Sequence, residues 1–210
     1  MPIIATKKDV IWNYLGTIAS IGSAFIVLPF LIYFLSSDYL GLWYVYLALG
    51  AFVTLFEFGF SPTFARNFSY CLSGADELKR EGRGVIREEG INVKLLAHLL
   101  KSSKRVYLRI TLIAGVVLAI PGTIYIISIS SSLDTNVVLI SWSVFVLANL
   151  INVYYLYYSA ALRGIGGIAI DNKIKVVSKT CQVIIMLIAL FCGFGLIGAS
   201  IAYLCNSLLF

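Results

Sequence analysis

The sequence has few charged residues. Of its 210 residues 12% are charged and 60% are hydrophobic, whereas an ordinary soluble domain has about 25% charged residues. One soluble core of this composition would leave too few polar side chains to cover its surface, so the apolar surface must be buried against lipid. The composition therefore excludes an ordinary soluble domain and predicts a membrane protein.

The residues that several kinds of chemistry require are also scarce. There is one histidine, and the four cysteines show no C-x-x-C spacing, so we expect neither a metal site nor a disulfide framework. The sequence contains no G-x-x-x-x-G-K-[ST] phosphate loop and no plausible Ser/His/Asp set. We therefore expect no enzymatic activity, no catalytic residue and no cofactor. Any transport would be driven by an ion gradient or by the gradient of the cargo.

Apolar stretches of membrane-spanning length make up most of the chain. A hydrocarbon layer of about 30 Å needs about 20 helical residues, whereas barrel strands would be about half as long and would alternate in polarity. The sequence thus predicts an all-α polytopic membrane protein, a bundle of five complete transmembrane helices and the start of a sixth. We expect these helices at residues 10–35, 40–62, 106–129, 137–162 and 174–194, with the sixth at 196–210.

The positive charges all lie on one set of connections. Every Lys and Arg lies before the first span, at or between the second and third spans, or at or between the fourth and fifth. The opposite connections have only Asp38 and Asp134 as charged residues. Because basic residues collect on the cytoplasmic side, we expect residues 1–9, 66–105 and 163–173 in the cytoplasm. This partition also argues against a nucleic-acid partner, which the net charge of +6 alone would allow.

Two charged regions near the spans need an interpretation. Lys175 and Lys179 lie early in the fifth span, and their side chains are long enough to snorkel to the interface. In the segment 92–105 leucines fall on one side of a helical wheel and cations on the other. This amphipathic helix would lie in the membrane interface, or it would pack on the inner rim of the bundle.

Glu57 is the one acidic residue well inside an apolar run. An intramembrane carboxylate is a candidate functional group, and Glu57 is our candidate for coupling transport to an ion. The alternative is that Glu57 lies close enough to the inner interface to be hydrated or hydrogen-bonded for structural reasons.

Several short segments are distinctive in their order and spacing. Residues 39–43 read Y-L-G-L-W, residues 56–61 read F-E-F-G-F-S with Arg66 and Asn67 following, residues 161–164 read A-L-R-G, and residues 195–199 read G-L-I-G-A. Together they resemble the polysaccharide and O-antigen flippases of the multidrug/oligosaccharidyl-lipid/polysaccharide exporter superfamily. Where that family has an Asp-Leu-Gly-like element, this chain has Glu57, Phe58 and Gly59.

The resemblance implies two bundles of six helices around a cavity that opens alternately to either side, and this chain is similar to the first bundle. The implied cargo is an oligosaccharide on a polyprenyl pyrophosphate, such as an O-antigen of lipopolysaccharide, a capsule unit or an exopolysaccharide unit. It would cross the bacterial cytoplasmic membrane. The implied partners are membrane lipid, a second half or second subunit, and polysaccharide polymerase or assembly proteins. Because the sixth run has only 15 residues, we expect a fragment or a truncated protein.

A cargo of this kind needs cations for its phosphates and polar groups for its sugars. Arg66 and Arg163 are the candidates for phosphate, because arginine can make bidentate contacts with phosphate oxygens. Asn13, Asn149 and Asn152 are the candidates for sugar hydroxyls. The alternatives are that the arginines are topological anchors and that the amides join neighbouring helices.

Two other functions remain open. One is a multidrug or small-cation exporter of the same superfamily, which we would expect to have more acidic residues within its spans. The other is a non-transporting membrane partner in an assembly.

Overall fold

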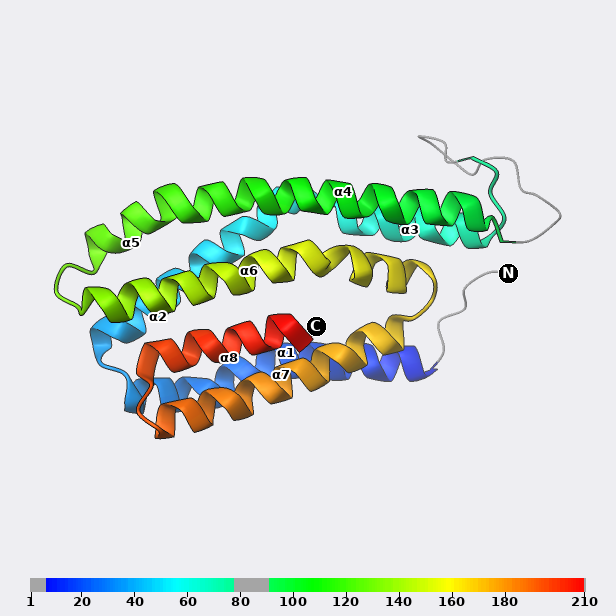
Figure 1. Cartoon of the computed structure of the whole chain (residues 1–210). Coiled ribbons are helices and arrows are strands. Elements are labelled where there is room, and N and C mark those ends of the chain that lie inside the picture. The colour runs from blue at the N-terminus through cyan, green and yellow to red at the C-terminus, as the bar shows by residue number, and fades with distance from the viewer. Residues whose placement is uncertain (1–6, 78–90, 210) are drawn as a thin grey trace.

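The computed structural model describes residues 7–77 and 91–209. The predicted amino-terminal segment and the middle of the predicted 66–105 loop therefore lie largely outside the described residues. Within these ranges the chain is α-helical and has no β-strand. The elements, shown in Figure 1, are α1 (Lys7–Phe34), α2 (Ser37–Thr54), η1 (Leu55–Glu57), α3 (Phe60–Leu72), α4 (Val93–Val117), η2 (Leu118–Gly122), α5 (Thr123–Ile129), α6 (Thr135–Gly164), α7 (Ile168–Phe191) and α8 (Gly195–Leu209).

Five helical stretches are long and apolar enough to cross a membrane, which confirms the predicted all-α polytopic membrane protein. Their outer surfaces are apolar, as the 72% exposed Phe25 of α1 illustrates, because lipid rather than water is their solvent. The helix α8 has 15 residues and is shorter than these spans. The five stretches are Asp9–Phe34, Ser37–Glu57, Val93–Ile129, Thr135–Gly164 and Ile168–Phe191.

The helices lie side by side, and their connections gather at two ends (Figure 1). One end holds the start of α1, the end of α3, the start of α4 and the α6–α7 turn. We call it the basic end because Lys7, Lys94 and Arg163 are there. The α1–α2, α5–α6 and α7–α8 turns lie at the opposite end, where the charged residues are Asp38 in the first turn of α2 and Asp134 just before α6. Within the bundle α1 packs along α7, and α6 contacts α3, α4 and α8.

The second span is broken, which the sequence did not predict. After η1 the chain passes through two residues with left-handed backbone, Phe58 at φ 46° and Gly59 at φ 75°, before α3 begins. Glycine adopts this conformation freely, whereas a residue with a Cβ pays about 1–2 kcal/mol for it. Pro62 lies in the first turn of α3, where proline is tolerated. The helix α3 continues to Leu72, so residues 66–72 are helical rather than part of a loop.

The segment 92–105 is not a separate interfacial helix. It forms the first part of α4, which begins with the side chain of Asn92 accepting a 3.0 Å hydrogen bond from the backbone amide of Leu95. Leu99 is buried, and Leu95 and Leu96 pack against the hydrophobic core. The leucine side therefore faces the bundle. Beyond α4, the π-helical turn η2 around Pro121 leads into α5.

Candidate anion site between α1, α6, α7 and α8

Three charged residues lie one turn apart on α7. Asp171, Lys175 and Lys179 are spaced i, i+4 and i+8, so they share one face of the helix. Lys179 is the twelfth of the 24 residues of α7, and at 1.5 Å per residue it lies about 17 Å from the first. A charged side chain therefore originates near the middle of a membrane-spanning helix.

Lys179 does not snorkel to the basic end, so that expectation is wrong for this residue. Its Nζ donates a 2.9 Å hydrogen bond to Oε1 of Gln182, which lies nearly one turn further from the basic end. Within residues 7–77 and 91–209 no carboxylate lies within ion-pair distance of Lys179. The half-buried ammonium is thus held inside the bundle by one neutral amide. A charge in that position calls for a compensating anion.

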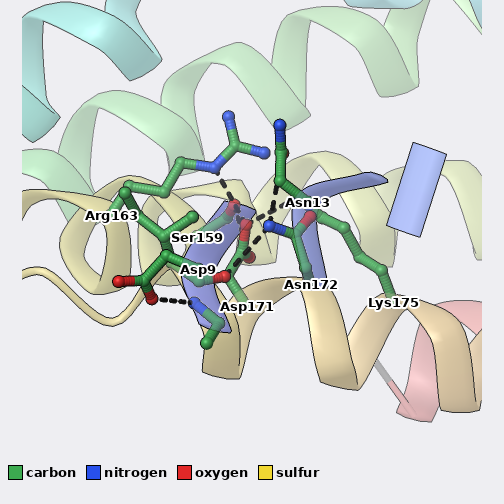
Figure 2. Close-up of polar contacts among 9 residues, drawn as sticks. Asp9, Asn13, Ser159, Arg163, Asp171, Asn172 and Lys175 are labelled. Atoms are coloured by element: carbon green, nitrogen blue, oxygen red, sulfur yellow. Dashed lines mark hydrogen bonds and ion pairs between the residues drawn. The ribbon is translucent and has the colours of Figure 1, made fainter. Parts of the chain in front are cut away.

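Lys175 takes part in a buried ionic cluster with Asp171. The carboxylate of Asp171 is 1% exposed. Its Oδ2 accepts from Lys175 Nζ at 2.7 Å and from Arg163 Nε at 2.8 Å, and its Oδ1 accepts from Ser159 Oγ at 2.8 Å. Figure 2 shows the ammonium and the guanidinium meeting the same carboxylate, one from α7 and the other from α6. The cluster contains two cations and one anion.

Two cavities meet at Lys179. The first, of about 200 Å³, is lined by five polar residues and one leucine and lies where α1, α6, α7 and α8 come together. The second, of about 160 Å³, is lined mainly by apolar residues and extends toward Trp43 of α2. Ser20 and Lys179 line both. The polar cavity is lined by Ser20, Asn152, Leu156, Lys175, Lys179 and Asn206. We call its four nitrogen-bearing residues, Asn152, Lys175, Lys179 and Asn206, the polar seam.

A third cavity, of about 310 Å³, lies at the basic end between α1 and the α6–α7 turn. Arg163 and Asn13 both line it. The side chain of Asn172 donates a long 3.4 Å hydrogen bond to Asn13, and Asp9 Oδ1 accepts a 3.1 Å hydrogen bond from the amide of Ala169 at the start of α7. These contacts, visible in Figure 2, join α1 to α7. The remaining donors of Arg163 are thus available at the cavity between them, because only its Nε has a hydrogen bond among the described residues.

The structure brings some of the predicted site residues together and separates others. Asn152 lines the polar cavity, and Asn13 and Arg163 line the cavity at the basic end. Asn149 is buried, donates to the backbone carbonyl of Phe145, and lies against Gly50 of α2, so it joins helices. Arg66 is exposed on α3 and makes no hydrogen bond or ion pair with the rest of the described chain.

Glu57 lies away from the seam, at the break in the second span. Its Oε1 accepts hydrogen bonds from the Tyr107 hydroxyl at 2.7 Å and from the Ser61 amide at 3.2 Å. These contacts agree with the structural alternative for this residue. Coupling of Glu57 to an ion stays a hypothesis.

Several polar residues at the site were not predicted from the sequence, among them Asp171, Asn206, Ser159 and Gln182. The fifth span was expected to begin at residue 174, which placed Asp171 in a loop, but α7 begins at Ile168. The signal that would have found it is the four-residue spacing of Asp171, Lys175 and Lys179, which is the spacing of one helix face.

Comparisons of the chain with protein-family models, with curated proteins and with solved structures found no match. The chemistry of the polar seam is therefore the main guide to function, and the resemblance of the short segments is a hypothesis beside it.

Proposed function

We propose that the chain forms a cargo-binding bundle of an exporter that flips polyprenyl-pyrophosphate-linked oligosaccharide across the bacterial cytoplasmic membrane by alternating access. The observation that carries this proposal is Lys179, a cation in the middle of a spanning helix whose one hydrogen-bond partner among the described residues is the neutral Gln182. A charge at membrane depth costs at least several kcal/mol when nothing compensates it. A diphosphate in the adjoining cavity would compensate it.

The residues around Lys179 suit the same cargo. Lys175 is one helical turn away, and side chains at i and i+4 are about 5–6 Å apart at their Cβ atoms. Two ammonium groups at this spacing can each meet one phosphate of a pyrophosphate. Asn152 and Asn206 supply amide donors and acceptors to the same cavity, where they would bind phosphate oxygens or sugar hydroxyls.

The charge of the seam argues against a small-cation exporter. Lysines line the polar cavity, and the neighbouring Asp171 already has two cations on it. A cationic drug would meet like charges, which costs free energy in a low-dielectric cavity. A non-transporting assembly partner has no need of ionisable groups between its helices, so the seam also favours a transporter over that alternative.

The positive charges support an orientation for this transporter. We place the basic end in the cytoplasm, because Lys and Arg flank its helices and basic residues resist translocation. The cargo would then approach from the cavity that Arg163 lines and move along α7 toward Lys179. A second bundle, supplied as another half or as a second subunit, would pack against the side of this bundle that carries the polar seam and would complete the pathway. A polysaccharide polymerase would take up the cargo after its release.

Complementation tests the proposal. Deletion of the gene should make lipid-linked sugar accumulate facing the cytoplasm, and the wild-type gene should reverse this. Lys179→Gln should fail to restore export at normal expression, whereas Lys104→Gln, which removes an exposed charge on α4, should restore it. Full restoration by Lys179→Gln, or no accumulation after deletion, would refute the proposal.

A further inference from the structure

Asp171 forms ion pairs with two cations, although one would be enough to compensate the charge of its carboxylate. A buried carboxylate is stabilised by one charged partner and by hydrogen bonds to its remaining lone pairs. Asp171 Oδ2 holds Lys175 at 2.7 Å and Arg163 at 2.8 Å, and Ser159 satisfies Oδ1. If one cation left, the carboxylate would keep an ion pair and a hydroxyl donor. The departure therefore does not strand a buried charge.

The two cations differ in how freely they can leave. Arg163 lies in the last turn of the neighbouring helix α6 and binds Asp171 through its Nε. Because Nε is part of the rigid planar guanidinium group, the whole group would have to move for this contact to break. Lys175 is a point charge on a flexible stem, and it lines the polar cavity while it binds Asp171. Rotation of the lysine stem moves the ammonium between the carboxylate and the cavity without any movement of the helix backbone.

The cavity provides a reason for Lys175 to be held. Lys179 is one turn away and has no carboxylate at ion-pair distance within the described ranges. Two ammonium groups facing an empty cavity would repel each other. Asp171 relieves this repulsion by drawing Lys175 to itself, and an entering anion with two charges would compete with Asp171 for it.

We infer that Asp171 is an exchangeable counter-ion, which holds Lys175 while the cavity is empty and yields it to the pyrophosphate of the cargo. Asp171 is thus a positioning residue, and Arg163 with Ser159 keeps its carboxylate compensated during the exchange. On release of the cargo, Lys175 returns to Asp171. The inference rests on the proposed function, because the competitor is the diphosphate of that cargo.

Binding measurements on the full chain test the exchange. The protein would be placed in phosphatidylcholine nanodiscs, which have no net anionic lipid, and titrated with polyprenyl pyrophosphate and separately with uncharged polyprenol. Inorganic pyrophosphate is added as a competitor to show whether the phosphate groups are what is recognised. Thermal unfolding of each variant is measured in parallel.

The decisive variant is the double substitution Asp171→Asn with Lys175→Gln, which preserves the net charge of the cluster. We expect it to bind polyprenyl pyrophosphate about tenfold more weakly than the wild type, because a charge-assisted contact to the cargo is lost. Equal affinity would overturn the inference, because it would mean that Lys175 serves only to neutralise Asp171. The double variant leaves Arg163 without its carboxylate, but the side chain of Arg163 is 47% exposed, so the variant leaves no buried charge unpaired and is well able to fold.

The single variant Asp171→Asn should change the affinity for polyprenyl pyrophosphate in the opposite direction. It removes the carboxylate that competes with the cargo for Lys175, so affinity for polyprenyl pyrophosphate should rise and release should slow. Unchanged or weaker binding by folded Asp171→Asn would overturn the exchange, and if this variant does not fold the double variant decides. If the wild-type protein bound polyprenol with the same affinity as polyprenyl pyrophosphate, the proposed function itself would be refuted. This outcome distinguishes failure of the proposed function from failure of the exchange.

Discussion

The hydroxyl of Tyr107 donates a 2.7 Å hydrogen bond to Oε1 of Glu57, and thereby ties the break in the second span to α4. The same oxygen accepts from the amide of Ser61 in the first turn of α3, where backbone amides have no intrahelical partner. Glu57 thus acts as a capping group for α3 and as a link to a neighbouring helix. Both functions need an acceptor oxygen, and neither needs a negative charge.

Two substitutions of Glu57 distinguish the role of its acceptor oxygen from the role of its negative charge. Glu57→Ala removes both hydrogen bonds and should lower the free energy of unfolding by about 1–3 kcal/mol. Glu57→Gln keeps Oε1 and should stay within about 0.5 kcal/mol of the wild type. Thermal unfolding in detergent or nanodiscs measures the difference. Equal losses in the two variants would show that the charge itself holds the structure.

The same Gln variant tests the ion-coupling hypothesis for Glu57. If the carboxylate binds and releases a coupling ion during transport, Glu57→Gln should fold and be expressed but should not export glycan. Unchanged export by a stable Glu57→Gln would reject that hypothesis and leave the structural role.

Gly164 allows α6 and α3 to approach closely. A Cβ added to Gly164 would lie 2.5 Å from both the Ala65 carbonyl oxygen and the Phe68 Cβ, so Gly164→Ala must push the helices apart. Overpacking of this kind costs about 1–3 kcal/mol. Gly41→Ala on α2 is a matched control, because nothing lies within 4 Å of its added Cβ, and alanine favours a helix. Unfolding measurements that rank the two variants equally would contradict this account of the contact.

The number and order of the spans could be predicted from length and hydrophobicity, but the extents of α3 and α4 at the basic end, the start of α7 and the break in the second span could not. The sequence predicts that spans end where charge begins, whereas α3 and α4 continue past that point at the basic end. They do so because Phe68 and Leu99 pack into the hydrophobic core, so protein contacts replace lipid contacts there. The break at Phe58 had a local signal in Gly59, but a glycine within a span is common enough that it does not mark a break by itself.

The candidate site could be predicted only in part, for a geometric reason. Asn149 and Asn152 are one turn apart on α6, yet Asn149 packs against Gly50 and Asn152 lines the polar cavity. Which face of a helix meets a cavity depends on its neighbours, and these are not encoded in the spacing of one helix. For Lys179 the sequence favoured snorkelling because a lone lysine in lipid does so. Inside the bundle its Nζ instead donates to Gln182, three residues further along α7.

The reactivities of two cysteines should differ strongly. Cys71 is buried at the end of α3, and burial raises the pKa of its thiol, whereas Cys192 is exposed in the α7–α8 turn. The thiolate is the reactive form, so a raised pKa lowers the reactive fraction at neutral pH. In single-cysteine variants a maleimide should label Cys192 quickly and Cys71 slowly. The Cys71 rate should still be rising as pH passes the usual thiol value of about 8.5. Equal rates would contradict the burial of Cys71.

Cys192 also reports which way the bundle faces. In the proposed orientation a membrane-impermeant maleimide should label Cys192 in intact cells. A cysteine introduced at the exposed Ser102 of α4 should react only after the membrane is permeabilised. The reverse pattern would place the basic end outside the cytoplasm and would remove the proposed route of the cargo.

Asp9 joins α1 to α7 by capping the start of α7. Its Oδ1 accepts from the Ala169 amide at 3.1 Å, and a negative charge at a helix amino terminus is favourable. Asp9→Ala should therefore destabilise the protein by about 1 kcal/mol and speed hydrogen exchange at the Ala169 amide. Asp38→Ala is the control, because Asp38 lies in the first turn of α2 but accepts no hydrogen bond in the described part of the chain. Because α1 packs mainly along α7, faster exchange should extend along α1 in Asp9→Ala and should be absent in Asp38→Ala. Identical exchange in the two variants would show that apolar packing alone holds α1 in place.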